Sequence, residues 1–248
     1  MNNVICLIPS RLSSRRLPGK ALLEIRGIPL IIHVAKRAML SASIHETYVC
    51  TDSLEISQAC SAYNIPFFVT KSHYRNGTER IASLAHKFPG SPIIDVQGDE
   101  PLLNPNHIDS VVQYLTTSPF SPDIVIPTLK TPYSSSDSIV RVLTSKSGRV
   151  MSLTRASVPY PFAKRPQFSL KHLSIIGFNP SALERYSALE PTYLEEFEDI
   201  ELLRAIESDF NVYSTELTGD SFSVDLEDDY IKAKLAFESD PFLEKYLG

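Results

Sequence analysis

Near its start the chain reads VICLIPSRLSSRRLPGK over residues 4–20, and this stretch indicates the fold. Its first five residues form a short apolar run, which predicts a buried strand. The run passes directly into a polar loop with four basic side chains, Arg11, Arg15, Arg16 and Lys20. A strand that empties into such a loop is how α/β proteins build an anion site at the carboxyl edge of a sheet. We therefore expect a phosphate-rich ligand there.

The composition is that of a folded domain with a modest negative charge. Hydrophobic residues make up 43% of the 248 residues, enough for the core of one large α/β domain. The formal net charge of −5 argues against a protein that coats nucleic acid, so the basic loop is interpreted as a local device for one small polyanion. We expect no membrane span, because no apolar run approaches ~20 residues, and no signal peptide.

Three cysteines, Cys6, Cys50 and Cys60, lack the spacing of metal ligands and cannot all pair with one another. Cys6 and Cys50 fall inside predicted strands, where a thiol behaves as a small hydrophobic group. We interpret all three as inert core residues in a reducing cytoplasm.

Strands and helices alternate with short connections as far as residue 128. The apolar patterns predict strands at residues 4–8, 47–51, 66–69, 92–96 and 124–127, and helices at residues 29–41, 54–63, 78–87 and 106–117. This alternation is typical of a Rossmann-like, doubly wound and mostly parallel sheet that is flanked by helices.

The pattern changes after residue 128. We predict strands at residues 139–143, 149–154, 173–178 and 211–217, and helices at residues 181–189, 194–208 and 227–239. The first two of these strands form a plausible hairpin. We interpret residues 1–248 as a single domain with an inserted β-rich arm at about residues 130–180. By analogy, such arms often carry substrate contacts or a dimer interface.

The basic loop suits a phosphate ligand by its chemistry. Arginine offers a planar fork of donors, lysine offers a compact charge, and Gly19 allows the backbone to approach a ligand. The loop lacks the Gly-x-x-x-x-Gly-Lys-Ser/Thr spacing of a Walker loop. A solvated charged loop is the alternative interpretation.

Two acidic residues fall at predicted strand ends. Residues 94–101 read IDVQGDEP and place Asp99 at the carboxyl end of the sheet, where a carboxylate can hold Mg²⁺ beside phosphate oxygens. An ordinary turn with solvated acids is the alternative. Asp225 follows a strand-like segment and precedes a helix, so a role near the helix N-cap is its alternative. Residues 77–80, GTER, open a helix whose N–H groups favour anions, although an ordinary helix start also fits.

Together these motifs closely resemble those of the CMP-Kdo synthetases, which are 3-deoxy-manno-octulosonate cytidylyltransferases. The resemblance covers nearly the whole chain, in order. The segments that carry it are PSRxxSxRLPGK at residues 9–20, Thr51-Asp52, NGTER at residues 76–80, VQGDEP at residues 96–101, RASVP at residues 155–159, His172, residues 201–204 and Val224-Asp225.

The resemblance implies a role for each matching residue. Those implied to bind the nucleotide CTP are Pro9, Ser10, Arg11, Arg16, Lys20, Asn76, Gly77 and Gln97. Asp99 and Asp225 match the two aspartates that hold Mg²⁺, and with Arg11 and Lys20 they form the implied catalytic set. Those implied to line the sugar pocket are Gln97, Arg155, His172, Ile176, Glu201 and Leu202, with Arg155 paired to the C1 carboxylate of the sugar. Arg15 has no counterpart of known role, and we interpret it as a solvated charge.

The departures from the family pattern cluster on the sugar side. Ile176 stands where the family has a tyrosine, and Leu202 stands where it has a glutamine. A site that hydrogen-bonds a hydroxyl group discriminates strongly against analogues that lack it. The hypothesis is that the chain takes a modified sugar such as 8-amino-Kdo or another ulosonic acid, and drift within a Kdo enzyme is the alternative.

The resemblance implies a cytoplasmic enzyme that transfers CMP from CTP to the anomeric hydroxyl group of an acidic 2-keto-3-deoxy sugar. Pyrophosphate is released, and the product serves lipopolysaccharide or capsule synthesis. A homodimer through the arm is also implied. A transferase for neutral sugar phosphates is a rival, but it favours a glycine-rich opening and residues 10–16 contain no glycine. A non-catalytic nucleotide-binding regulator is a second rival, which should have lost Asp99 or Asp225.

Overall fold

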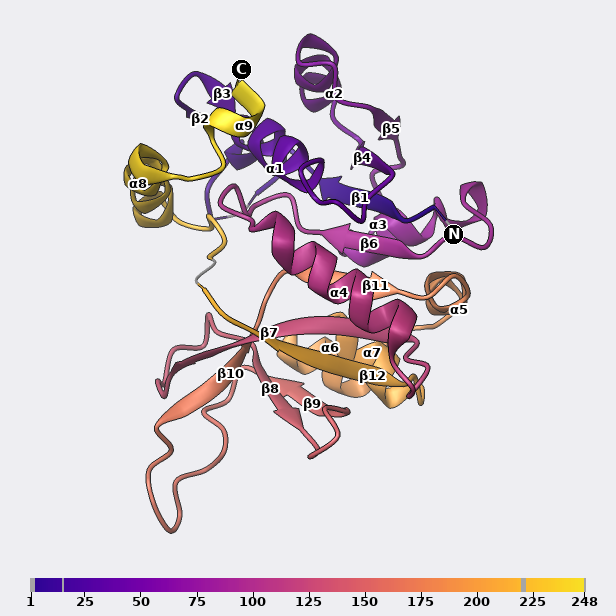
Figure 1. Cartoon of the computed structure of the whole chain (residues 1–248), viewed down its shortest axis with the longest axis vertical. Coiled ribbons are helices and arrows are strands. Elements are labelled where there is room, and N and C mark those ends of the chain that lie inside the picture. Colours follow the sequence, from indigo (N-terminus) through magenta and orange to yellow (C-terminus); the bar gives the residue numbers. More distant parts are fainter. Residues whose placement is uncertain (1–2, 15, 220–221, 248) are drawn as a thin grey trace.

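A ten-stranded mixed sheet with helices on both faces runs through the described part of the chain (Figure 1). The structure is a computed structural model that describes residues 3–14, 16–219 and 222–247, so Arg15 lies outside the described residues. The strand order is β5-β4-β1-β6-β11-β7-β10-β8-β9, with β12 beside β7. The strands are β1 (Ile5–Ser10), β4 (Glu46–Thr51), β5 (Phe67–Val69), β6 (Ile93–Val96), β7 (Ile124–Pro132), β8 (Arg141–Thr144), β9 (Val150–Thr154), β10 (Phe168–His172), β11 (Ile175–Phe178) and β12 (Val212–Leu217).

The helices and a small hairpin complete the described elements. The helices are α1 (Leu30–Ala38), α2 (Leu54–Ala62), α3 (Gly77–Ala82), α4 (Pro105–Thr117), α5 (Ala182–Ser187), α6 (Tyr193–Glu198), α7 (Leu202–Glu207), α8 (Glu227–Ala236) and α9 (Glu244–Leu247). The hairpin joins β2 (Glu24–Ile25) to β3 (Ile28–Pro29), and it turns at Arg26 and Gly27, which both have positive φ. The sequence patterns did not predict this hairpin.

The first part of the sheet is parallel, as the alternating pattern predicted. Strands β5, β4, β1 and β6 all run in the same direction. All six residues of β1 are buried, because helices cover both faces of a sheet of this kind. Figure 1 shows α4 crossing one face, with α6 and α7 on the other. The mostly parallel α/β fold is thus confirmed.

An antiparallel strand lies in the middle of the sheet. Strand β11 pairs antiparallel with β6 on one side and with β7 on the other. Strand β10 precedes it along the chain and also pairs antiparallel with β7, with the register shifted by two residues between the His172–Thr128 and Gly177–Val125 pairs. The predicted strand at residues 173–178 is thus found as β11, and β10 before it was not predicted. This arrangement brings His172 and Ile176 beside the end of β6.

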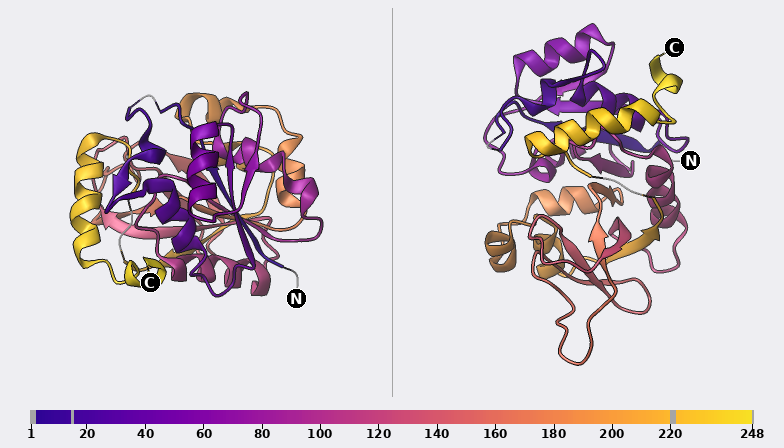
Figure 2. Two further views of the ribbon diagram at one scale, coloured as in Figure 1. Left: turned by 90° about the horizontal axis from the view of Figure 1, so that it is seen from above. Right: turned by 90° about the vertical axis from the view of Figure 1, so that its left-hand side faces the viewer.

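Strands β8, β9 and β10 extend the sheet beyond β7. Strands β8 and β9 form the predicted antiparallel hairpin. The loop between β9 and β10 projects from this end of the molecule (Figure 2). Among the described residues, no helix is both long enough and apolar enough to cross a lipid bilayer.

The predicted single helix at residues 194–208 is broken in the structure. Helix α6 ends at Glu198, and Asp199 adopts a left-handed conformation with φ of 51° before α7 begins. Side chains draw this turn away from the helical path, because Arg155 binds the carbonyl oxygens of Glu198 and Asp199 at 2.9 and 3.2 Å. Tertiary contacts here override the helical periodicity of the sequence.

A buried ion pair ties the C-terminal segment to α1. Arg37 and Asp240 are 2% and 3% exposed, and Arg37 Nη1 lies 2.6 Å from Asp240 Oδ2. Arg37 also donates to the carbonyl oxygen of Leu103 at 2.6 Å. Removing one partner of such a pair leaves an uncompensated buried charge, which is strongly destabilising.

We expect the substitution Asp240→Asn to lower the free energy of unfolding by about 3 kcal/mol. The exposed pair between Lys130 and Glu216, with side chains 51% and 50% exposed, provides the control. Its variant Glu216→Gln should lose less than about 1 kcal/mol. Urea unfolding of both variants measures the difference. Equal losses in the two variants would contradict the expectation.

Candidate functional site

The structure gathers a basic side chain and two strand-end carboxylates at the carboxyl edge of the sheet. Lys20 Nζ donates to Asp99 Oδ2 at 2.7 Å and to Asp225 Oδ1 at 2.9 Å. Arg16 pairs with the other oxygen of Asp225, also at 2.9 Å. We call these four residues the carboxylate–lysine cluster. The basic loop therefore lies against both acids that the sequence placed at strand ends.

The ion pairs shift the titration of this cluster. Burial opposes the charged forms of both Lys20 and Asp225. For Lys20 the carboxylates of Asp99 and Asp225 outweigh this effect, and for Asp225 the contact with Lys20 does. The pKa of Lys20 is raised from its ordinary value, and the pKa of Asp225 is lowered, with Arg16 contributing to the second effect. Both groups are therefore charged at neutral pH.

Backbone contacts hold the two acidic segments together. The N–H of Val224 donates to the carbonyl oxygen of Asp99 at 2.8 Å, across a long separation in the chain. Asp229 accepts from the N–H groups of Asp225 and Leu226, so it serves the start of α8. Asp229, and not Asp225, therefore caps the start of α8. The Asp225 carboxylate instead contacts Lys20 and Arg16.

Two glycines allow three loops to meet at this edge. A Cβ atom on Gly98 would lie 2.8 Å from the carbonyl oxygen of Pro9, and one on Gly77 would lie 2.9 Å from Pro9 Cγ. Such distances are too short for any side chain. Asn76 caps α3 by accepting from the N–H of Glu79 at 2.8 Å. The Pro9, Asn76–Gly77 and Gln97–Gly98 segments are therefore packed against one another.

Arg11 differs from Lys20 and Arg16 in its surroundings. It is exposed, and it forms no ion pair with the part of the chain that the structure describes. Ser10, at the end of β1, is only 7% exposed. The guanidinium of Arg11 is thus free to meet a ligand that approaches the basic loop.

A cavity of about 240 Å³ opens next to this cluster. Six predicted residues line it, namely Asn76, Gln97, His172, Ile176, Glu201 and Leu202. The sequence patterns did not single out its other lining residues, which are Val140, Ser174, Glu195, Asp199 and Ile200. The structure therefore brings nearly all of the expected sugar-side residues to one place.

Arg155 is the predicted sugar-side residue that does not line this cavity. Its guanidinium donates to the backbone carbonyl oxygens of Asp137, Glu198 and Asp199. Its backbone N–H donates to the Glu198 carboxylate at 2.9 Å. In this structure Arg155 holds the turn between α6 and α7, which in turn positions Glu201.

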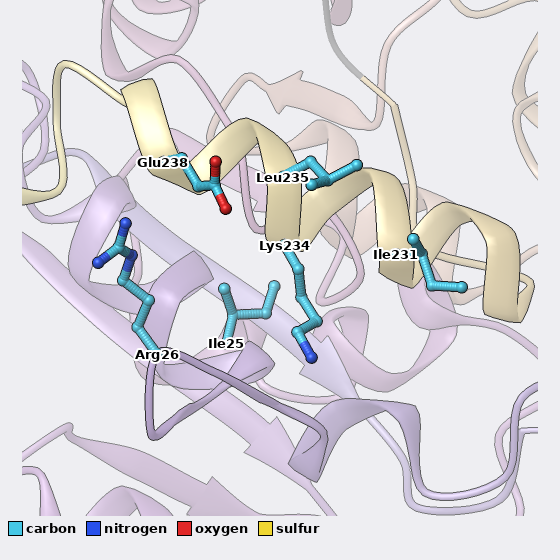
Figure 3. A pocket seen from close by; sticks show the side chains of 6 residues that line it. All are labelled: Ile25, Arg26, Ile231, Lys234, Leu235 and Glu238. Carbon is cyan, nitrogen blue, oxygen red and sulfur yellow. The ribbon is translucent and has the colours of Figure 1, made fainter.

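A second cavity, of about 500 Å³, lies between the β2–β3 hairpin and α8 (Figure 3). Its lining residues are Ile25, Arg26, Ile231, Lys234, Leu235 and Glu238. None of them belongs to the predicted site. Three of its six lining residues are apolar, and none of the six belongs to the carboxylate–lysine cluster.

Two carboxyl groups share Thr78 behind the smaller cavity. Asp95 is fully buried in β6, and its Oδ2 accepts from the Thr78 hydroxyl at 3.2 Å. Glu201 Oε2 accepts from the Thr78 N–H, also at 3.2 Å. Burial raises the pKa of both carboxyl groups, and the charge of Glu201 raises that of Asp95 further. Asp95 was not predicted, although a lone acid in the apolar run of residues 93–96 was its signal.

His172 is neutral in this site. Burial lowers its pKa to about 4. Its ring hydrogen-bonds the carbonyl oxygen of Pro127, and its Nδ1 is buried with no partner among the described residues. Because a carbonyl oxygen only accepts, the other ring nitrogen carries the proton and Nδ1 is an acceptor.

The three cysteines are free and buried, as predicted. Burial raises the pKa of the Cys60 thiol to about 11 and raises those of Cys6 and Cys50 further. Such thiols are un-ionised at neutral pH and therefore unreactive. They take no part in the site.

Comparisons with known proteins find a matching family and similar sequences. The family described as Cytidylyltransferase matches residues 5–215. The chain is 34% identical to the 3-deoxy-manno-octulosonate cytidylyltransferase of Chlorobium limicola, over 92% of this chain and 94% of that protein. It is 30% identical to the protein of the same name from Escherichia coli, over 91% and 92% of the two chains.

Solved structures extend the likeness to three dimensions. The structure of CMP:2-keto-3-deoxy-manno-octonic acid synthetase complexed with CTP superposes with a TM-score of 0.89 at 28% identity, covering 96% of this chain and 99% of that one. A glucose-1-phosphate thymidylyltransferase from Bacillus anthracis has a TM-score of 0.71 at 11% identity, covering 95% and 96% of the two chains, and shares the fold alone.

The carboxyl pair predicts a pH effect on stability. The folded pair keeps a proton at pH values where the unfolded chain has released it, so wild-type stability falls as the pH rises above about 4.5, the ordinary pKa of a glutamate. The variant Glu201→Gln removes the contribution of Glu201 to this loss and leaves that of Asp95. Its free energy of unfolding should rise relative to wild type by up to about 1.4 kcal/mol per pH unit.

Urea unfolding at several pH values between about 4.5 and about 8 measures this difference. The variant Asp95→Asn should show the same trend, and the double variant should show a larger rise than either single one. A stability difference that does not change with pH would contradict the raised pKa values of the two carboxyl groups.

Proposed function

The chain belongs to the cytidylyltransferase family, and we propose that it transfers CMP from CTP to the anomeric hydroxyl group of 3-deoxy-manno-octulosonate or a close relative. The observation that carries this proposal is the carboxylate–lysine cluster beside the cavity that Gln97 and Glu201 line. A polyanion and an acidic sugar bound there would meet at the carboxyl edge of the sheet.

The basic loop is suited to the triphosphate. Arg11 and Arg16 are exposed, and Lys20 is a partly buried cation at the end of the loop. Arginine pairs with phosphate through two parallel N–H donors, and lysine adds a compact charge. These three residues would bind the phosphates and offset the charge that develops on the leaving pyrophosphate. Pro9, Ser10, Asn76 and Gly77, which pack together, would hold the cytidine.

Asp99 and Asp225 fit a bound divalent cation. Their oxygen atoms converge on the Lys20 ammonium at 2.7 and 2.9 Å, so two carboxylates already share one cation. Mg²⁺ prefers one or two carboxylates together with phosphate oxygens. When bound, Mg²⁺ would offset phosphate charge and lower the pKa of the attacking hydroxyl group. Lys20 would then turn from the acids to the phosphates.

The reaction balances without a protein nucleophile. The anomeric oxygen of the sugar forms a bond to the α-phosphorus of CTP, and the bond between that phosphorus and the bridging oxygen to the β-phosphorus breaks. Pyrophosphate leaves with the electron pair, and the hydroxyl proton passes to solvent. The residues of this chain bind and orient the two reactants, and such positioning supplies much of the rate in transfers of this kind.

We further propose that the enzyme acts in the cytoplasm as a homodimer and supplies activated sugar for lipopolysaccharide or capsule. The dimer proposal rests on the resemblance and on exposed apolar side chains of the segment at residues 130–180. Tyr160 and Phe162 are 79% and 92% exposed in the projecting loop, and Met151 is 57% exposed in β9. Contiguous exposed apolar patches mark interaction surfaces, and a dimer contact would remove these side chains from water.

We expect Asp99→Asn to bind CTP nearly as wild type does while its turnover falls by roughly 100-fold or more, because charge stabilisation at the reacting phosphate is lost. Pyrophosphate release with CTP, Mg²⁺ and a panel of 2-keto-3-deoxy acids measures turnover, and calorimetry measures CTP binding. The exposed Asp228 of α8 supplies the control, and Asp228→Asn should keep wild-type turnover. Wild-type turnover by Asp99→Asn would refute the assignment.

The homodimer is tested by static light scattering. We expect twice the chain mass of 27.7 kDa at micromolar concentration, and a lower mass for the double variant Tyr160→Ser, Phe162→Ser. A wild-type protein that scatters as a monomer would contradict the proposed dimer.

A further inference from the structure

The smaller cavity presents hydrogen-bond acceptors to its ligand and no cation. Its lining residues include the acidic Glu195, Asp199 and Glu201, and among the described lining residues none is a lysine or an arginine. His172, the remaining titratable group on the wall, is neutral. A ligand therefore enters a site of negative charge.

The negative charge is unevenly balanced. Arg204 neutralises Glu195 through a contact of 2.7 Å and also pairs with Glu79 at 2.9 Å. Glu201 and Asp95 have no ion-pair partner in the described ranges. Their contacts are with Thr78 and, for Asp95, with Gln97, all of which are neutral. Asp95 is fully buried and Glu201 is partly buried, and a buried carboxylate without a cation is unfavourable unless a ligand supplies the missing positive charge.

Asp95 also sets the orientation of the Gln97 amide. Gln97 Nε2 lies 3.1 Å from both carboxylate oxygens of Asp95, so the amide nitrogen faces the acid. The carbonyl oxygen Oε1 is then the group that Gln97 offers to a ligand. The buried Nδ1 of His172, on the same wall, is likewise an acceptor without a donor. Both side chains can therefore accept a hydrogen bond from a ligand.

Ile176 and Leu202 make another part of the cavity wall apolar. Both are almost fully buried and line the same cavity. They offer no hydrogen bond to a hydroxyl group, and a buried hydroxyl without a partner is unfavourable. The cavity therefore combines an apolar part with a strongly accepting, negatively charged part.

We propose that this cavity selects an acidic 2-keto-3-deoxy sugar in which an amino group replaces one hydroxyl group, and that Glu201, supported by Asp95, recognises the ammonium. This inference rests on the proposed function. An ammonium group has three donors and no acceptor, so it matches Glu201, Gln97 Oε1 and His172 Nδ1, and it supplies the missing positive charge. The carboxylate end of the same sugar faces the basic loop, so the two ends of the ligand meet opposite charges.

The test compares substrates in the wild-type enzyme with CTP and Mg²⁺. The panel is Kdo and a set of analogues in which each hydroxyl group other than the anomeric one is replaced in turn by an amino group. We expect one amino analogue to have a kcat/KM at least about tenfold above that of Kdo, carried mainly by KM.

Two variants locate the preference. Glu201→Gln and Asp95→Asn should each reduce the preference for the amino analogue by about tenfold. Glu196→Gln, an exposed position on α6, is the matched control and should keep the preference. If a variant fails to fold, calorimetry on the wild type in two buffers of different ionisation enthalpy provides the second measurement. Binding of the amino analogue should release a proton from the Asp95–Glu201 pair, and binding of Kdo should not.

The outcomes separate the two levels of the proposal. A wild-type preference for Kdo overturns the inference and leaves the proposed function standing. An amino preference that survives Glu201→Gln overturns the role of Glu201. If no sugar acid of the panel supports pyrophosphate release although CTP still binds, the proposed function and the inference are both overturned.

Discussion

The shared contact of Lys20 with Asp99 and Asp225 is the interaction on which the site depends. It joins three strand-end segments that are 79 and 205 residues apart in the chain. Two carboxylates placed this close repel one another unless a cation lies between them. Lys20 supplies that cation in this structure and so holds the two acids together. The same oxygens are then in place for a metal ion.

The antiparallel strand β11 decides what lies beside this cluster. A purely parallel sheet would have placed another strand–helix unit next to β6. Instead, β11 returns along β7 and brings Ile176 to the end of β6, with Asp95 as its partner in the register. The turn between α6 and α7 then closes the cavity with Glu201 and Leu202. The nucleotide-side and sugar-side residues become neighbours through this one exception to the parallel pattern.

Much of the fold was predictable, because its signals are local. The apolar runs of β1, β4 and β6 and the helical periodicity of α1 and α4 are each contained in a few residues. The long strand β7, the split of α6 from α7 and the β2–β3 hairpin were not predicted. In each case contacts from distant segments decide the structure, as Arg155 does for the turn after α6.

For the site, the sequence by itself determined which chemical groups follow which strands, since a strand end and the loop after it are adjacent in the chain. Arg11, Lys20 and Asp99 could be placed at the carboxyl edge on that ground alone. The tertiary structure alone decided that Asp95 and Glu201 share Thr78 and that Arg155 binds backbone carbonyls instead of lining the cavity. The physical reason is that desolvation and charge balance depend on neighbours from every packed element, and no local pattern records them.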